Sequence, residues 1–256
     1  MTSIDELKRI AGREKVGVGM VEKDHAITVA LLIISRTEFS RTMVFKGGTA
    51  IKKMFYPETR FSEDLDFNCE RDITEELGKE IKRSLIENNQ GVAFTGVSQE
   101  EPRSDEGRRL RFGYKDSNGY PSSIRLDLAF REKSIMRARK MEVKNLYGVR
   151  KIIVTTMNIE EIAAEKVRAL IVTRRPRHLY DVWFLLRKQI KPSNELIDQK
   201  LKLYDKKFDV DILRSSIKEV QVDWQTDLEA LTSEVPRFSD VEQYVADAFQ
   251  DSSSKK

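Results

Sequence analysis

Cysteine and histidine are scarce in this 256-residue sequence, which contains one cysteine, Cys69, and two histidines, His25 and His178. A single cysteine excludes an intrachain disulfide and a zinc site built from several cysteines. Two histidines are too few for a metal site dominated by imidazole ligands. This usage is typical of a reducing compartment, and we therefore expect a cytoplasmic protein.

Long apolar runs are also missing. The longest apolar segment, residues 26–34, contains a threonine and is far shorter than the roughly 18 apolar residues that suggest a membrane-spanning helix. The first residues, Met-Thr-Ser-Ile-Asp-Glu-Leu-Lys, lack the basic and apolar segments of a signal peptide. We expect no membrane partner. With 39% hydrophobic and 34% charged residues, the chain has the composition of a soluble protein with one large domain or two smaller ones.

Neither sign of charge dominates, because 46 basic residues face 42 acidic ones and the net charge is +4. This balance alone says little about nucleic-acid binding. Local basic clusters are more informative, and they lie at residues 108–111, 137–140 and 174–177. Any one cluster is more commonly a solvated charged surface. Three clusters predict that at least one of them contacts RNA.

The spacing of apolar residues predicts a mixed α/β first half and an all-helical second half. In the first half we expect helices at 4–16, 22–36, 50–56 and 73–88, and strands at 43–46, 65–68, 92–97, 108–114, 122–130 and 151–155. Asp116-Ser-Asn-Gly predicts a hairpin turn between two of these strands. In the second half we expect helices at 159–173, 178–188, 193–204, 208–219, 224–232 and 239–249. The predicted domains are 1–156 and 157–250, followed by a disordered tail at 251–256. No coiled-coil pattern is present, so we expect a monomer.

A Gly-Gly-Thr motif, Gly47 to Thr49, follows the predicted strand 43–46. A helix that begins beside glycines offers free backbone N–H groups and the positive end of its dipole, which suits the phosphates of an NTP. Thr49 adds a hydroxyl group. For the glycines alone, a tight turn with a capping threonine is the simpler interpretation. The acidic residues that follow favour the nucleotide interpretation.

Asp64 and Asp66 are two residues apart, so on a strand both carboxylates point to the same face, roughly 6.5–7 Å apart along the chain. Such a pair can hold two Mg²⁺ ions about 3.5–4 Å apart for displacement at phosphorus. Asp127 lies in the apolar strand Ile-Arg-Leu-Asp-Leu-Ala-Phe, where an unpaired carboxylate costs several kcal/mol. Its alternative partner is Arg125 on the same face, and we favour the metal. Asp127 is then a metal ligand or the general base for an acceptor hydroxyl.

Two charged residues of the helical half also stand out. Asn158-Ile-Glu-Glu161 forms a capping box, and Lys166 lies on the apolar stripe of the helix that it starts. Lys166 must extend to solvent or face a cleft, where it can neutralise a phosphate. Asp181 lies in a mainly apolar segment, and its simplest partner is Arg177 at i,i+4. Such a pair can also line a substrate cleft.

Four motifs occur in order along the chain. They are Lys46-Gly-Gly-Thr with Arg60-Phe-Ser-Glu-Asp-Leu-Asp66, Arg125-Leu-Asp-Leu-Ala-Phe-Arg-Glu132, Ala164-Glu-Lys166-Val-Arg-Ala-Leu170, and Arg177-His-Leu-Tyr-Asp181. Together they resemble the AbiEii/AbiGii toxin family, nucleotidyltransferase-like proteins of the DNA polymerase β superfamily. The resemblance implies an α+β (α/β) fold, in which a nucleotidyltransferase core with a mixed sheet flanked by helices is followed by a C-terminal helical bundle.

The resemblance also implies roles for individual residues. The metal ligands are Asp64, Asp66 and Asp127. The catalytic residues are these three with Lys166 and Asp181. The nucleotide-binding residues are Lys46, Gly47, Gly48, Thr49, Lys166 and Arg177. Two positions depart from the family pattern, since the family often has serine at Thr49 and aspartate at His178.

From these residues we predict a nucleotidyltransferase that uses two Mg²⁺ ions, with Mn²⁺ as an alternative, to move an NMP from an NTP to RNA. The expected acceptor is the 3′ end of a tRNA. The resemblance further implies a toxin of an abortive-infection toxin–antitoxin system with a separately encoded antitoxin. Two alternatives are nucleotidylation of a small molecule, as with aminoglycosides, or of a protein. A third is a nucleotide- or RNA-binding regulator without turnover.

Overall fold

The structure, a computed structural model, describes residues 2–85, 90–100, 107–131 and 134–250. The chain divides into two compact units, Met1–Met157 and Asn158–Lys256, which we call unit 1 and unit 2. The predicted disordered tail at 251–256, the last residues of the predicted helix 73–88, and Glu132 of the second family motif lie outside the described residues. Within the described ranges, no helix has the length and apolar character needed to cross a membrane.

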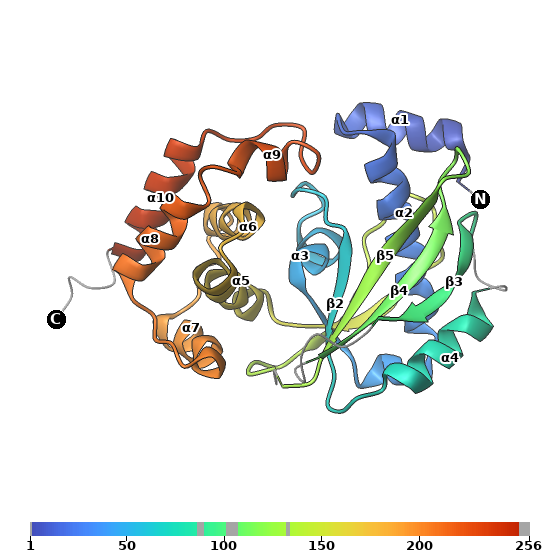
Figure 1. Ribbon diagram of the computed structural model, residues 1–256, viewed down its shortest axis with the longest axis horizontal. Helices are drawn as coiled ribbons and strands as arrows, with labels where there is room; N and C mark the ends of the chain where they lie inside the picture. The colour runs from blue at the N-terminus through green and yellow to red at the C-terminus, as the bar shows by residue number, and fades with distance from the viewer. Residues whose placement is uncertain (1, 86–89, 101–106, 132–133, 251–256) are drawn as a thin grey trace. The chain divides into compact units, whose positions relative to one another are not determined.

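Unit 1 is built on one seven-stranded sheet with strand order β3-β4-β5-β2-β1-β7-β6. Its strands are β1 (Val44–Lys46), β2 (Asp64–Asn68), β3 (Ala93–Gln99), β4 (Gly107–Lys115), β5 (Pro121–Ala129), β6 (Arg139–Glu142) and β7 (Ile153–Thr156). The β2–β5 and β1–β7 pairs are parallel, and the other pairs are antiparallel. Figure 1 shows β3, β4 and β5 running side by side. The predicted mixed sheet is confirmed.

The helices of unit 1 are α1 (Ile4–Glu14), α2 (Val18–Ser35), α3 (Gly47–Ala50) and α4 (Thr74–Ser84), with a 3-10 helix η1 (Glu38–Arg41) and a π-helix η2 (Ile51–Phe55). Helix α2 contacts β5, and α4 contacts β3 and β4. Residues 26–34 of α2 are buried on every side, which explains why this helix is apolar all round.

The two faces of the sheet differ in chemistry because successive strand residues point to opposite sides. One face is apolar and buried, and it carries Phe45, Phe67, Phe112, Ile124 and Leu126. The opposite face carries most of the charged residues of β1, β2, β4 and β5, among them Lys46, Asp66 and Asp127. The alternation thus separates the core from a row of charges on a single sheet.

A buried polar cluster ties α2 to the segment that follows the glycine motif. The Lys53 ammonium donates hydrogen bonds to Asp24 Oδ2 at 2.6 Å and to Thr28 Oγ1 at 2.9 Å. The Tyr147 hydroxyl donates to the same Asp24 oxygen at 2.6 Å. Desolvation by burial raises the pKa of Tyr147, and Asp24 raises it further. The cluster therefore holds an ammonium and a neutral phenol against one carboxylate.

The neighbouring residue, Lys52, is anchored in another direction. Its ammonium donates to the carbonyl oxygens of Pro57 at 2.7 Å and Thr59 at 2.8 Å, and lies 4.0 Å from the centre of the Phe61 ring. Burial lowers the pKa of Lys52 to about 8. Both lysines belong to the π-helix η2, in which the Tyr56 N–H donates to the Ile51 carbonyl. Insertions of this kind are often found at functional sites.

Unit 2 contains only helices among its described residues. They are α5 (Ile159–Thr173), α6 (Pro176–Arg187), α7 (Asn194–Leu201), η3 (Lys202–Tyr204), α8 (Val210–Glu219), α9 (Trp224–Leu228) and α10 (Phe238–Gln250). Asn158 caps α5 by accepting a hydrogen bond from the Glu160 N–H at 2.9 Å. Glu161 pairs with Lys200 of α7 at 2.6 Å. The predicted helical second half is confirmed.

Several boundaries differ from the prediction. Strand β6 was not predicted, because its four residues are mostly charged and show no clear alternation. The helix after β1 begins at Gly47 and becomes a π-helix, whereas the sequence predicted a helix at 50–56. The predicted turn at Asp116 is confirmed, since the Asp116 carboxylate accepts hydrogen bonds from the N–H groups of Asn118 and Tyr120.

The buried His25 makes the stability of unit 1 sensitive to acid. Burial lowers its pKa to about 4, and the positive charge of Lys53 adds to this effect. Between pH ~6.5 and ~4 the unfolded chain binds a proton that the folded chain does not, so stability falls as the pH falls. The loss amounts to about 3 kcal/mol for this group. We expect the His25→Gln variant to lose less stability than the wild type between about pH 7 and pH 4.5 in thermal melts. An equal loss in both proteins would contradict this role.

Candidate active site

A row of three charged residues crosses β1, β2 and β5. The antiparallel register places Lys46 opposite Asp66, and the parallel register places Asp66 opposite Asp127. Residues opposite each other on neighbouring strands share a face of the sheet and have Cβ atoms about 4.5–5.5 Å apart. Asp64 lies on the same face, two residues before Asp66. The strand register thus gathers Lys46 and all three predicted carboxylates on the polar face.

Gly47 follows this row directly and approaches Asp66. Its φ is +81°, and a Cβ atom built on it would lie 2.1 Å from Asp66 Oδ2. Only glycine fits here without displacing the carboxylate, and a left-handed backbone disfavours other residues as well. The sequence motif therefore has a steric reason: the chain turns from strand to helix against the Asp66 carboxylate.

Gly48 and Thr49 complete the first turn of α3. Both residues are buried. The Thr49 hydroxyl donates a hydrogen bond to the backbone carbonyl of Asp64. In this structure the hydroxyl joins the helix start to the start of β2. The predicted contact of Thr49 with a phosphate stays a prediction.

Arginine side chains form hydrogen-bonded ion pairs with two of the three carboxylates, Asp64 and Asp127. Arg125 donates to both oxygens of Asp64, at 2.7 and 2.6 Å. Arg109 of β4 donates to both oxygens of Asp127, at 2.5 and 3.2 Å. The sequence suggested Arg125 as the ion-pair partner of Asp127. The structure corrects that pairing. Arg125 of β5 pairs with Asp64 of β2, and Asp127 of β5 pairs with Arg109 of β4, the neighbour on its other side.

Each hydrogen-bonded carboxylate raises the pKa of its arginine, Asp127 for Arg109 and Asp64 for Arg125. Within the described ranges, no group of three or more His, Cys, Asp and Glu side chains is arranged to hold a metal ion. The donor set nevertheless has the right chemistry, because carboxylate oxygens are the ligands that Mg²⁺ prefers. The Arg125 side chain is 40% exposed, so it has room to turn toward solvent.

The predicted residues of unit 2 form separate pairs. Lys166 of α5 and Asp181 of α6 make a buried ion pair at 2.7 Å, with the two side chains 9% and 2% exposed. Lys166 therefore does not extend to solvent. Arg177 pairs with Asp227 at 3.0 Å, and its backbone N–H also donates to that carboxylate. Asp181 of α6 thus pairs with Lys166 of the neighbouring helix α5, whereas the sequence suggested Arg177 of its own helix.

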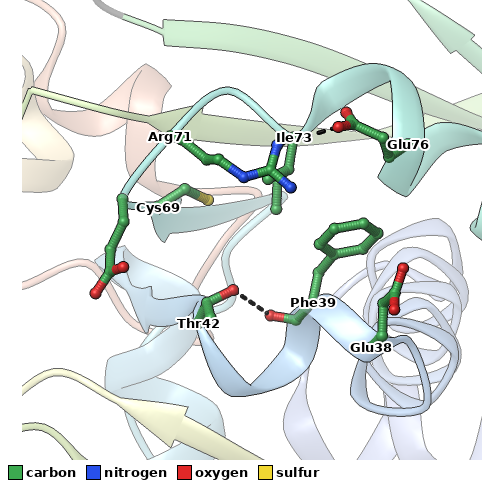
Figure 2. A pocket seen from close by; sticks show the side chains of 8 residues that line it. Glu38, Phe39, Thr42, Cys69, Arg71, Ile73 and Glu76 are labelled. Atoms are coloured by element: carbon green, nitrogen blue, oxygen red, sulfur yellow. Dashed lines mark hydrogen bonds and ion pairs between the residues drawn. The ribbon is translucent and has the colours of Figure 1, made fainter.

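A pocket that the sequence did not reveal lies beyond the end of β2 in unit 1. Its volume is about 570 Å³, and its lining includes Phe39, Cys69 and Ile73 (Figure 2). Figure 2 also shows Arg71 beside Glu76, an ion pair of 3.0 Å. Burial raises the pKa of the Cys69 thiol to about 12, which makes it a neutral and unreactive group. No predicted site residue lines this pocket.

Residues 30–250 match the family described as Nucleotidyl transferase AbiEii toxin, Type IV TA system. The chain belongs to the AbiEii nucleotidyltransferase toxin family. The predicted family and the predicted enzyme class are therefore confirmed. Membership implies an NTP substrate and an antitoxin partner. All four sequence motifs lie within the matched residues.

Two solved structures are similar to the chain. MenT4, a nucleotidyltransferase toxin from Mycobacterium tuberculosis H37Rv, aligns over 100% of this chain and 91% of its own, with 18% identity and a TM-score of 0.67. At this identity the likeness establishes a shared fold alone. An antigenic nucleotidyltransferase-like protein from Paracoccidioides brasiliensis aligns over 79% and 92% of the two chains, with 12% identity. Its TM-score of 0.41 is too low to establish a shared fold. The comparison with curated proteins gave no match.

The Gly47 contact gives a direct test of the site. In Gly47→Ala the new methyl group must displace the Asp66 carboxylate, and a displacement of about 1 Å can cost 10²-fold in rate. We expect nucleotidyl transfer to fall by at least about 100-fold, with a stability loss of about 1–2 kcal/mol from the left-handed backbone. The control is Gly12→Ala in α1, where nothing lies within 4 Å of the added Cβ. Full activity of Gly47→Ala would show that Asp66 needs no fixed position.

The Lys166–Asp181 pair is open to a second test. Removing one member of a buried ion pair costs about 3–5 kcal/mol, so Lys166→Met is expected to lower the melting temperature of unit 2. Replacing both residues, as Lys166→Met/Asp181→Leu, removes the charge imbalance and should restore much of that stability. We expect activity to remain lost in the double variant. Recovery of activity together with stability would assign the pair a structural role only.

Proposed function

We propose that this AbiEii-family enzyme transfers an NMP from an NTP to an RNA acceptor, at the 3′ end of a tRNA, and that the carboxylates of β2 and β5 form its reaction centre. The observation that carries the proposal is the in-register row of Asp66 and Asp127 beside Gly47. This row brings acidic groups and a helix start together on one polar face. Phosphate groups and divalent cations are the ligands that suit such a combination.

The metal ligands in this proposal are Asp64, Asp66 and Asp127, with Mg²⁺ as the ion and Mn²⁺ as a substitute. A bound divalent ion supplies charge neutralisation at the phosphates of the NTP. Asp66 lies against Gly47. Asp64 and Asp127 must exchange an arginine partner for the ion, and the released guanidinium groups are then placed to bind phosphate oxygens.

The remaining residues have roles in binding. The first-turn N–H groups at Gly47 and Gly48 have no carbonyl partner within the helix and suit the triphosphate. Lys46 lies opposite Asp66 and contributes positive charge to the same face. Thr49 fixes the turn through the Asp64 carbonyl. Roles for Lys166, Asp181 and Arg177 of unit 2 rest on the family motif.

An RNA acceptor is favoured over the alternatives by charge. Exposed basic residues gather at the β6 edge of the same sheet, namely Arg139, Lys140 and the nearby Arg137, and such a surface suits a polyanion better than a cationic aminoglycoside. Protein nucleotidylation is a second candidate. A regulator without turnover is disfavoured by the intact row of acidic residues. The proposed location of the reaction is the cytoplasm, where NTP and tRNA meet, and a separately encoded antitoxin would block it.

The experiment measures label transfer from each of four radiolabelled NTPs to total tRNA in the presence of Mg²⁺. We expect transfer by the wild type, loss on chelation, and recovery with added Mg²⁺ or Mn²⁺. Asp66→Asn should lower transfer by about 10²–10³-fold, the usual effect of removing one group that stabilises transition-state charge. The same loss is expected for Asp64→Ala.

The matched control is Asp205→Asn, a conservative change at an exposed residue whose left-handed backbone asparagine tolerates. Its transfer rate should equal that of the wild type. Label that appears on protein or on an aminoglycoside, with none on RNA, would replace the proposed acceptor. Wild-type rates in Asp66→Asn would remove Asp66 from the reaction centre.

A further inference from the structure

Positive charge is concentrated in one stretch of unit 1 around the edge strand β6. Residues 134–151 contain six basic side chains and one acidic side chain, Glu142, a net charge of +5. The whole chain carries only +4, so the rest of the molecule is close to neutral. Arg137, Arg139, Lys140 and Arg150 are all exposed. We call these four residues the β6 basic edge.

Ion pairing separates this edge from the other two basic clusters of the sequence. At 108–111 every arginine has a carboxylate partner: Arg108 with Asp72, Arg109 with Asp127, and Arg111 with Glu100. At 174–177 two of the three arginines are paired, Arg174 with Glu219 and Arg177 with Asp227.

The β6 basic edge differs, because none of its four residues makes a salt bridge to a carboxylate in the described part of the chain. The one ion pair in this stretch joins Lys151 to Glu142 at 3.1 Å, and Lys144 donates to the Phe55 carbonyl. The net charge of the edge is therefore available to an external anion.

The strand order places this edge at a useful distance from the carboxylates. β6 is the last strand of the sheet, and β7 and β1 separate it from β2. Three strand spacings correspond to about 14 Å. Lys140 lies opposite Thr155, which points to the side of the sheet opposite to Thr156 and Phe45. Lys140 thus shares the polar face with Asp66 and Asp127, whereas the exposed Arg139, opposite Thr156, projects from the other side of the same edge.

We propose that the β6 basic edge binds the phosphate backbone of the acceptor RNA and holds its reactive end toward the carboxylates. This inference rests on the proposed transfer to RNA. A span of about 14 Å corresponds to about four nucleotides along one strand of a duplex. Single charged residues on an edge strand commonly serve to prevent strand pairing. Four basic residues without a carboxylate partner among the described residues are more than protection of an edge strand requires, and they match the repeating negative charge of a nucleic-acid backbone.

The test variant is Arg137→Gln/Arg139→Gln/Lys140→Gln, which removes three exposed charges. Its matched control is Lys202→Gln/Lys206→Gln/Lys207→Gln, which removes three exposed lysines of unit 2. Both should melt at the wild-type temperature, because every changed residue is exposed. Binding of labelled total tRNA is measured between about 50 and 200 mM salt, and transfer kinetics are measured with the preferred NTP.

Log K falls as log salt rises, and each phosphate contact adds about 0.7–0.9 to the magnitude of that negative slope. For the test variant we expect the magnitude of the slope to decrease by about 2, RNA affinity to fall at least about tenfold, and KM for RNA to rise accordingly. The turnover number at saturating RNA and the KM for NTP should stay at the wild-type values. The control variant should match the wild type throughout.

Wild-type affinity and salt slope in the test variant would overturn the inference and leave the proposed transfer to RNA intact. An equal loss in the control variant would also overturn it, because net charge alone would then explain the effect. Loss of antitoxin binding with RNA binding unchanged would identify the edge as a protein-binding surface. A wild type that neither binds nor labels RNA would refute the proposed acceptor as well.

Discussion

The pairing register of β1, β2 and β5 is the constraint on which the candidate active site depends. Because Lys46, Asp66 and Asp127 stand opposite one another, their side chains share one face, and a shift of one residue in any strand would turn its member of the row into the core. The apolar residues between them, Phe45, Phe67 and Leu126, fix that register by their burial. Hydrophobic packing on one side of the sheet thereby positions the charges on the other.

Much of this arrangement could be predicted from the sequence, since alternation, glycine placement and apolar periodicity are local signals. The chain order of the strands and the change to helices after about residue 156 follow from them. The partners of the charges could not be predicted, because they depend on which strands become neighbours. Arg125 is close to Asp127 in sequence, yet it pairs with Asp64 of β2, and Arg109 arrives from β4. The pairing of Lys166 with Asp181 likewise joins two helices.

Short and irregular elements form the other group that the sequence did not reveal. Strand β6 has too few apolar residues to show a period of two, and it exists because β7 supplies its hydrogen bonds. The π-helix η2 depends on buried contacts of Lys52 and Lys53 that no local pattern indicates. The distribution of unpaired charge also could not be predicted from the sequence. Composition describes a nearly neutral protein, whereas the fold neutralises most arginines of two clusters and leaves a third unpaired.

The two adjacent lysines of η2 have a mechanical consequence. Successive helical residues project in different directions, and here one ammonium is held by Asp24 of α2 while the other is held by the carbonyl groups of Pro57 and Thr59. Rotation of the segment about its own axis in either sense would break one anchor. The two anchors therefore resist rotation of η2 about its axis. Because η2 follows the Gly47–Thr49 turn directly, they also help to fix the orientation of that turn, although neither lysine needs to contact a substrate.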